Sequence, residues 1–129
     1  MRALAVAGLL GGLVTSTATP SAAASLTAYV GGVRVEVSSV PQPPARSRMT
    51  AYTVRLVDSA GTPVTGAQVT LTGRMTDGMS VAAPLRPTGE PGIYRGEVLF
   101  TMAGRWDLRV RVARQGRRFE VPLKEEVAR

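Results

Sequence analysis

The sequence predicts an all-β fold, an antiparallel β-sandwich of about seven strands. Between Val33 and Leu123, hydrophobic and polar residues alternate in short runs, and segments rich in Pro, Gly, Asp and Ser separate these runs. Alternation with a period of two places the hydrophobic side chains on one face of each strand, where two sheets can bury them. No span of helical period and helical length follows the N-terminal segment.

The first half of this region predicts three strands. Val and Leu alternate there with Arg, Glu, Ser and Thr, and two turn-forming segments, Pro41–Pro44 and Asp58–Pro63, interrupt the alternation. The strands are expected at residues 33–38, 52–56 and 67–72.

The second half predicts four more strands. Residues 80–85 are expected to form a short edge strand, because they lie in an irregular segment that contains Pro84 and Pro87. Gln115-Gly116 forms a turn before the last strand. The other three strands are expected at residues 94–100, 105–112 and 119–123.

Two aromatic residues open neighbouring strands and predict the type of sandwich. Tyr94 lies where the chain enters a strand, and its hydroxyl is placed to bind backbone groups, as the tyrosine corner does in immunoglobulin-like sandwiches. Trp106, the only tryptophan, is expected to fill the centre of the core. The predicted fold is therefore an immunoglobulin-like antiparallel β-sandwich of about seven strands.

The N-terminus has the three parts of a secretory signal peptide. Met1-Arg2 is a short positive start, residues 3–14 are an uncharged hydrophobic run, and Ser21–Ala24 are the small residues that signal peptidases accept. The run is shorter than the about 20 residues of a membrane-spanning helix, which makes a retained anchor the less favoured interpretation. We expect a signal peptide at residues 1–24, cleaved after Ala24 or Ala23, and a secreted or periplasmic protein with no transmembrane segment after cleavage.

Residues 25–129 have the size of one domain. The chain contains no cysteine, so this domain must be stable without disulfides. Without Arg2, its 15 Lys and Arg residues exceed its 9 Asp and Glu residues by six. Outside the cytoplasm, the anions available to such a surface are phospholipid headgroups, envelope polymers and acidic proteins, so nucleic acid is not an expected partner.

Several short motifs follow one another along this domain: TVRLVD at 53–58, GTPV at 61–64, GAQV at 66–69, PGIY at 91–94 and MAGRWDL at 102–108. Their order resembles the YtkA-like family of exported bacterial domains, which is related to the FixH-like group. The resemblance covers residues 33–123. It implies an immunoglobulin-like sandwich in the cell envelope that is associated with copper handling or with the assembly of metal-containing membrane complexes.

Three methionines are the candidate metal ligands. Members of the family commonly carry methionine, often with histidine, in the segment that matches Gly73–Ser80, and this segment contains Met75 and Met79 but no histidine. Met102 lies in the turn before Trp106. Neutral thioether sulfur prefers Cu(I) to hard divalent ions, so the hypothesis is a Cu(I) site and not a Cu(II) or Zn(II) site. The alternative is that the methionines fill gaps in the core.

Six arginines are the candidate partner surface, and they are Arg105, Arg109, Arg111, Arg114, Arg117 and Arg118. The first three share the outward face of one predicted strand, and the others surround the hairpin that follows. Arginine suits bidentate recognition of carboxylate or phosphate, which favours an acidic envelope protein or an anionic membrane surface as partner. The alternative is a solvated face whose charges discourage edge-to-edge pairing of sheets.

The sequence does not predict an enzyme. The chain has no histidine and no cysteine, which excludes the common nucleophile–base pairs and most zinc sites. Its carboxylates form no spaced acid–base pair, and Gly31-Gly32 precedes a strand and not a helix, so it is no phosphate loop. Two hypotheses are carried forward: a copper-associated envelope domain, and a metal-free interaction module.

Overall fold

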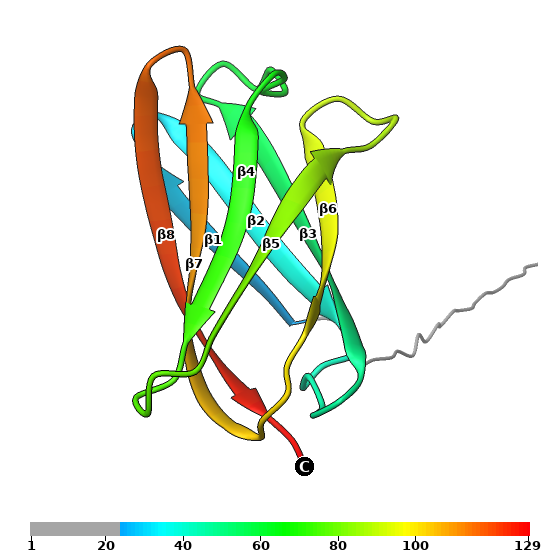
Figure 1. The fold of residues 1–129 in the computed structure, drawn as a ribbon. Coiled ribbons are helices and arrows are strands. Elements are labelled where there is room, and N and C mark those ends of the chain that lie inside the picture. The colour runs from blue at the N-terminus through cyan, green and yellow to red at the C-terminus, as the bar shows by residue number, and fades with distance from the viewer. Residues whose placement is uncertain (1–23) are drawn as a thin grey trace, which may run out of the picture.

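A computed structural model describes residues 24–129, which form eight β-strands (Figure 1). The predicted signal peptide at residues 1–24 lies, except for Ala24, outside the described residues. The strands are β1 (Ala24–Val30), β2 (Val33–Val40), β3 (Met49–Asp58), β4 (Gln68–Arg74), β5 (Ser80–Pro87), β6 (Ile93–Leu99), β7 (Gly104–Arg114) and β8 (Arg117–Val127).

The strands form one antiparallel sheet that curves into a nearly closed barrel. Their order is β1-β2-β3-β6-β5-β4-β7-β8, so β1 and β8 are the two edges. These edges face each other across a seam, where Cα atoms of β1 and β8 come within 8 Å, but no ladder joins them in the described part of the chain. The all-β prediction is confirmed, whereas the two separate sheets of the predicted sandwich are joined into one.

Strand β5 makes this connection, which corrects its prediction as an edge strand. Residues Ser80–Leu85 pair with β4, and Arg86 and Pro87 pair with β6 on the other side. Pro84 lies in the part of β5 that has a ladder partner on one side only, where its missing N–H costs no hydrogen bond. The proline therefore indicated correctly that one side of this segment is unpaired, although β5 as a whole lies in the middle of the sheet.

The sequence analysis did not predict β1, and this is why the structure has eight strands instead of about seven. Leu26, Ala28 and Val30 pair with the inward residues of β2, but the residues between them, Thr27 and Tyr29, carry no charge, so the alternation is weak. A two-residue Gly31-Gly32 turn joins β1 to β2, with φ of 58° and 79°. Two glycines between extended runs are a hairpin signal that could have revealed this strand.

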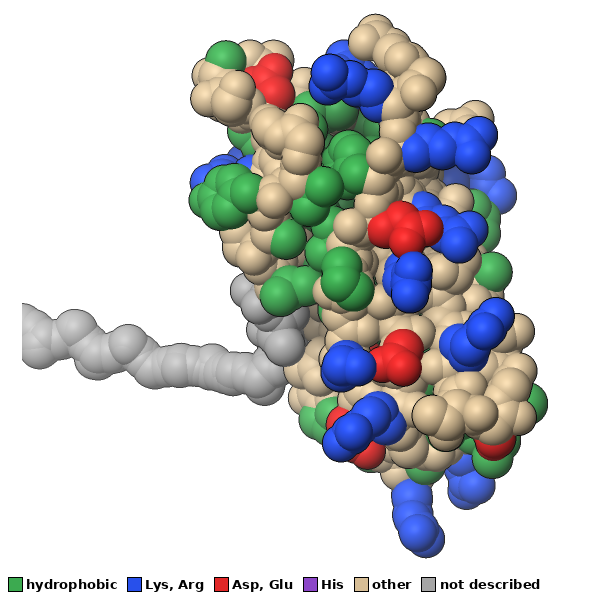
Figure 2. Space-filling view, turned by 90° about the vertical axis from the view of Figure 1, so that its left-hand side faces the viewer, with side chains coloured by type: hydrophobic (Ala, Val, Ile, Leu, Met, Phe, Trp, Pro, Cys, Tyr) green, Lys and Arg blue, Asp and Glu red, His purple; other side chains and the backbone are tan. Residues whose placement is uncertain are grey.

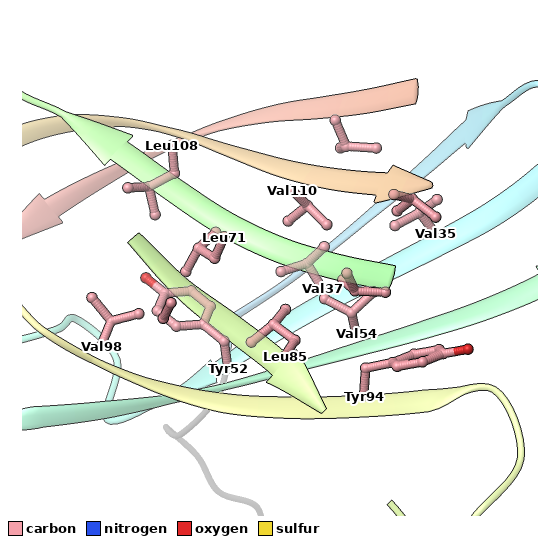
Figure 3. Packing of buried hydrophobic residues seen from close by; sticks show 14 of the residues in the cluster. Val35, Val37, Tyr52, Val54, Leu71, Leu85, Tyr94, Val98, Leu108 and Val110 are labelled. Carbon is pink, nitrogen blue, oxygen red and sulfur yellow. The ribbon is translucent and has the colours of Figure 1, made fainter. Parts of the chain in front are cut away.

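The alternating hydrophobic residues form the core as predicted. Trp106 is fully buried and meets Phe100 edge to face, with ring centroids 5.2 Å apart and an interplanar angle of 61°. Figure 3 shows Leu71, Leu85 and Val110 packed between facing strands, with the oxygens of Tyr52 and Tyr94 pointing in opposite directions along the core. Both tyrosines therefore place a hydroxyl near an end of the barrel.

The Tyr94 hydroxyl binds backbone, as predicted, but it anchors the loop between β3 and β4 and not the turn that leads into its own strand. Its hydroxyl donates to the Val64 carbonyl at 2.9 Å and accepts from the Ala67 N–H at 3.2 Å. These partners belong to a loop some 30 residues earlier in the chain and not to the turn that Tyr94 itself ends. The tyrosine therefore closes the upper end of the barrel, as oriented in Figure 1.

We predict that Tyr94→Phe lowers the free energy of unfolding by about 1–3 kcal/mol, because it leaves the buried Val64 carbonyl and the partly buried Ala67 N–H without the hydroxyl as partner. Urea unfolding followed by tryptophan fluorescence measures this change. Tyr29→Phe is the matched control, since Tyr29 is 76% exposed and its loss of a hydroxyl should change the stability little. Equal effects of the two substitutions would contradict the anchoring role.

Candidate functional site

Met75 and Met79 close the hairpin between β4 and β5. The Met75 N–H donates to the Met79 carbonyl at 2.8 Å, and the Gly78 N–H donates back to the Met75 carbonyl at 3.1 Å. The last ladder pair before them is Arg74 with Ser80, so Met75 stands opposite Met79 on the next rung. Opposed residues of an antiparallel pair have Cβ atoms about 4.5–5.5 Å apart on the same face of the sheet. The register thus brings these two side chains to one face.

That face is the inner one, and it brings Met75 next to Trp106. Met75 continues the inward row of Leu71 and Gly73, and the register between β4 and β7 pairs Arg74 with Asp107, so Met75 reaches the level of Trp106. Met75 is half-buried and packs on the core. Its methyl carbon lies 3.0 Å from where a Cβ on Gly104 would stand, which places it against the start of β7.

Met102 is held near Trp106 by a hydrogen bond to its backbone carbonyl. The Trp106 indole N–H donates to the Met102 carbonyl at 3.0 Å and so holds the connection between β6 and β7 over the end of the barrel. The Met79 and Met102 side chains are 37% and 40% exposed. Figure 1 shows the β4–β5 and β6–β7 connections close together at the lower end. We call this the methionine end, defined by Met75, Met79 and Met102.

The predicted arginine face of β7 is occupied by ion pairs. Arg109 and Arg111 both bind Glu120 of β8, at 3.0 and 2.9 Å, and Arg105 lies 3.8 Å from Glu126. All of these side chains are exposed or partly exposed, where each pair stabilises the fold by about 0–1 kcal/mol. This face is therefore a mixed-charge ladder and not a uniformly basic ribbon.

The same ladder includes a lysine paired with an aspartate. Lys124 donates to Asp107 at 2.7 Å, and this hydrogen bond and charge, with smaller contributions from Arg105 and Arg109, hold the pKa of Asp107 below its ordinary value. Asp107 thus stays ionised to a lower pH than a free aspartate. Together with Glu120 and Glu126, it offsets most of the positive charge of the strand face.

The remaining arginines stand at the upper end. Arg114 and Arg117 are directly opposed across the two-residue turn between β7 and β8, and Arg118 opposes Ala113. Arg114 donates its Nε–H to the Thr65 carbonyl at 3.1 Å. Within residues 24–129, neither Arg117 nor Arg118 has a carboxylate at ion-pair distance. The six predicted arginines therefore divide into a compensated group of three and an uncompensated hairpin group.

The motifs that carry the family resemblance meet one another in space. Gly92, with φ of 78°, brings its carbonyl to the Leu56 N–H at 2.8 Å, and a Cβ there would stand 2.9 Å from both the Leu56 carbonyl oxygen and Pro63. Tyr94 binds the backbone at Val64, and the Trp106 indole binds that of Met102. The family profile described as YtkA-like matches residues 27–111.

The chain belongs to the YtkA-like family. The match begins within β1, the strand that the sequence analysis did not predict. No curated protein matches the sequence.

Two solved structures share the fold of this YtkA-like domain. The crystal structure of a DUF4426 family protein from Pseudomonas aeruginosa has a TM-score of 0.64 and 15% identity, covering 81% of this chain and 94% of the other. The crystal structure of the Lin-41 filamin domain has a TM-score of 0.54 and 24% identity, covering 72% of this chain and 92% of the other. Both likenesses concern the fold alone, and the filamin neighbour is immunoglobulin-like.

Residues 24–129 of the YtkA-like domain contain neither a cluster of His, Cys, Asp and Glu for a metal ion nor a membrane-spanning helix. No group of three or more His, Cys, Asp or Glu side chains in this range is arranged to hold a metal ion. No helix in this range has the length and hydropathy needed to cross a membrane.

A buried carboxylate near the seam was missed by the sequence analysis. Glu125 of β8 is only 8% exposed and accepts a hydrogen bond from the Tyr52 hydroxyl of β3 at 2.7 Å. The Ser39 hydroxyl of β2 lies 3.5 Å from the same oxygen and accepts from the Gln42 amide at 2.7 Å. This network connects β8 to the opposite half of the barrel beside a cavity of about 180 Å³.

The sequence carried a signal for this network. Glu125 continues the inward row of Phe119, Val121 and Leu123, where the alternation calls for a hydrophobic residue. A charge on such a row indicates a buried polar contact, because an unpaired buried carboxylate is costly. Burial, and then the bond to Glu125, raise the pKa of Tyr52 far above its ordinary value of 10.0. In the folded YtkA-like domain, Tyr52 is therefore a neutral donor to a carboxylate.

We predict that the domain loses stability as the pH rises above about 10, because the unfolded chain releases the Tyr52 proton there and the folded chain retains it. The loss attributable to Tyr52 approaches at most about 1.4 kcal/mol per pH unit. The measurement is urea unfolding between about pH 9 and pH 11 for the wild type and Tyr52→Phe. The variant should be the less stable protein at about pH 9, and the difference should narrow above pH 10. Parallel pH profiles would contradict this assignment.

Proposed function

We propose that this protein is an exported, immunoglobulin-like, non-enzymatic binding domain that holds Cu(I) at its methionine end. Met75, Met79 and Met102 are the proposed ligands. The observation that carries the proposal is the register of the β4–β5 hairpin, which sets Met75 opposite Met79 at the level of Trp106, the residue that also binds the Met102 backbone.

The donor chemistry supports Cu(I) over other metals. Thioether sulfur is soft and neutral and prefers Cu(I), whereas Cu(II) and Zn(II) favour imidazole, thiolate or carboxylate ligands. The chain has no histidine and no cysteine to supply the first two. Thioethers release no proton on binding, so affinity at such a site should vary little with pH. The family resemblance, which implies an association with copper handling, favours the same metal.

The exposure of the ligands favours carriage over permanent storage. Met75 is half-buried against the core, whereas Met79 and Met102 present more than a third of their surface to solvent. A partner's sulfur ligands could therefore approach a bound ion from the side of these two residues. In this proposal the domain binds and transfers a cation in the cell envelope and breaks no covalent bond.

The single tryptophan lies at the level of the proposed ligands. Trp106 is fully buried beside Met75, and its indole face is an electron-rich surface that attracts nearby cations. Because its N–H is held by the Met102 carbonyl, the ring cannot turn away from this end of the barrel. The fluorescence of this single tryptophan should therefore respond to an ion held by the thioethers.

We predict that Met75→Leu/Met79→Leu/Met102→Leu weakens Cu(I) binding by at least about tenfold, equivalent to about 1.4 kcal/mol. Leucine preserves the hydrophobic volume but removes the sulfur, so the fold is retained. The measurement is competition with a Cu(I) chelator under anaerobic, reducing conditions, with Trp106 fluorescence as a second readout. Cu(I) binding by the wild type no tighter than that by the triple variant would overturn the proposal.

Met49→Leu is the matched control for this experiment. Met49 is the first residue of β3, is 51% exposed and pairs with Leu99 near the same end of the barrel. Its neighbour Thr50 is buried, so Met49 lies on the outward face, away from the proposed ligands. The substitution removes one thioether from this end and should leave Cu(I) affinity unchanged. If Met49→Leu lowered Cu(I) affinity as much as the triple variant, Cu(I) binding would not be specific to the three proposed ligands.

Export is part of the proposal, and it rests on the three-part N-terminal segment. We predict that the full chain, expressed in a Gram-negative host, is recovered from the periplasm as a product that begins at Ser25 or Ala24. Intact-mass spectrometry of the periplasmic fraction determines the first residue. Leu9→Asp/Leu10→Asp interrupts the hydrophobic run and should leave the chain unprocessed in the cytoplasm. An unprocessed wild-type protein would contradict the prediction.

A further inference from the structure

A hollow opens at the upper end of the barrel, opposite the methionine end. It encloses about 610 Å³ between the β1–β2 turn, the loop before β4 and the β7–β8 hairpin. Its floor is hydrophobic and consists of Val33, Val64, Val112 and Phe119. Val64 and Val112 are almost fully buried, so the core closes the hollow from below. Figure 2 shows hydrophobic side chains recessed along this side of the molecule, with Lys and Arg side chains at the upper end and along one wall.

The rim of this hollow is basic. Arg114, Arg117 and Arg118 line it together with Gln115 and Gly31. Within the described residues, Arg117 and Arg118 have no carboxylate partner, in contrast to the paired arginines lower on β7. Arg114 and Arg117 are directly opposed in the ladder, an arrangement in which like charges destabilise a sheet. An anion bound between them would remove this repulsion.

A second opposed arginine pair shows that charge alone does not define the site. Arg86 of β5 stands opposite Arg95 of β6, and both side chains are exposed. Neither of them lines the upper hollow. Only the hairpin pair combines uncompensated positive charge with a recessed hydrophobic floor, which is the arrangement that anchors one hydrophobic side chain within a polar rim.

The outline of the upper end favours a protein segment over a membrane. The two turns that line the hollow have Gly31-Gly32 and Gln115-Gly116 at their tips, and neither tip has a large hydrophobic side chain to insert into lipid. Apart from Tyr29 near the end of β1, which is 76% exposed, the exposed large hydrophobic residues, such as Val40, Met49 and Met102, lie toward the methionine end. The floor is closed by core valines, which favours one inserted side chain over a long acyl chain.

We propose that the upper hollow binds a segment of an acidic partner protein, in which one hydrophobic side chain enters the hollow and neighbouring carboxylates bind Arg117 and Arg118. Guanidinium groups bind carboxylates through paired, charge-assisted hydrogen bonds. The site lies at the opposite end from the methionines, so it is independent of the Cu(I) proposal. The domain could bind Cu(I) and the partner protein at the same time.

The test is an NMR titration of the domain, residues 25–129 of the processed chain, with a blocked peptide in which leucine is flanked by glutamates. Amide shifts should concentrate at the β1–β2 turn and at residues 115–119. Arg117→Glu/Arg118→Glu should weaken the binding by at least about tenfold. Replacing the peptide's leucine by serine, or its glutamates by glutamines, should each reduce the shifts. No shifts, or equal shifts with the glutamine peptide, would overturn the proposal.

Arg86→Glu/Arg95→Glu is the matched control, because it makes the same change in net charge at the other opposed arginine pair. It should leave peptide binding unchanged, and a loss equal to that of the hairpin variant would show non-specific attraction. A flotation assay with phosphatidylglycerol vesicles at about 0.1 M salt, where charges act over about 10 Å, tests the lipid alternative. Retention on vesicles that the hairpin variant abolishes, without peptide shifts, would replace the protein partner with a membrane surface.

Discussion

The barrel depends on three aromatic side chains whose rings are buried and whose polar atoms must still find partners. Tyr94 binds the backbone of the loop before β4, Trp106 binds the carbonyl of Met102, and Tyr52 binds the carboxylate of Glu125. A buried hydroxyl or indole N–H without an acceptor costs more than the hydrogen bond contributes when it is made. Each ring therefore determines where a loop or strand must lie, and the loops at both ends are held by the core itself.

This arrangement separates the domain into two ends with different chemistry. Trp106 holds the β6–β7 connection beside the β4–β5 hairpin, which places Met75, Met79 and Met102 at the lower end. Tyr94 holds the loop that contains Val64, and Val64 is part of the floor of the upper hollow. Under the two proposals, the domain carries Cu(I) at one end while an acidic partner protein binds the other.

Much of the fold followed from the sequence, because alternation reports burial directly. Val54, Leu71 and Val110 lie inward as their period of two predicts. Strand β1 escaped prediction because it is an edge strand with one half-buried face and no charged residue to mark the outer one. The continuity of the sheet through β5 also could not be predicted, since which strands pair depends on contacts far apart in the sequence. The ion pairs of Arg109 and Arg111 with Glu120 required the β7–β8 register, whereas Glu125 on a hydrophobic row could have been recognised.

The family motifs account for architecture more than for function. Gly92 is required because its backbone passes within van der Waals contact of Leu56 and Pro63, and Tyr94 and Trp106 are anchors of loops. Met102 enters this framework through its carbonyl, which any residue could supply, so its side chain is free to serve another purpose. The same freedom applies to Met79 and Arg117, which lie outside the motifs on turns that the framework holds in place. Differences of function among domains with this framework should therefore arise from the side chains on these two sets of turns.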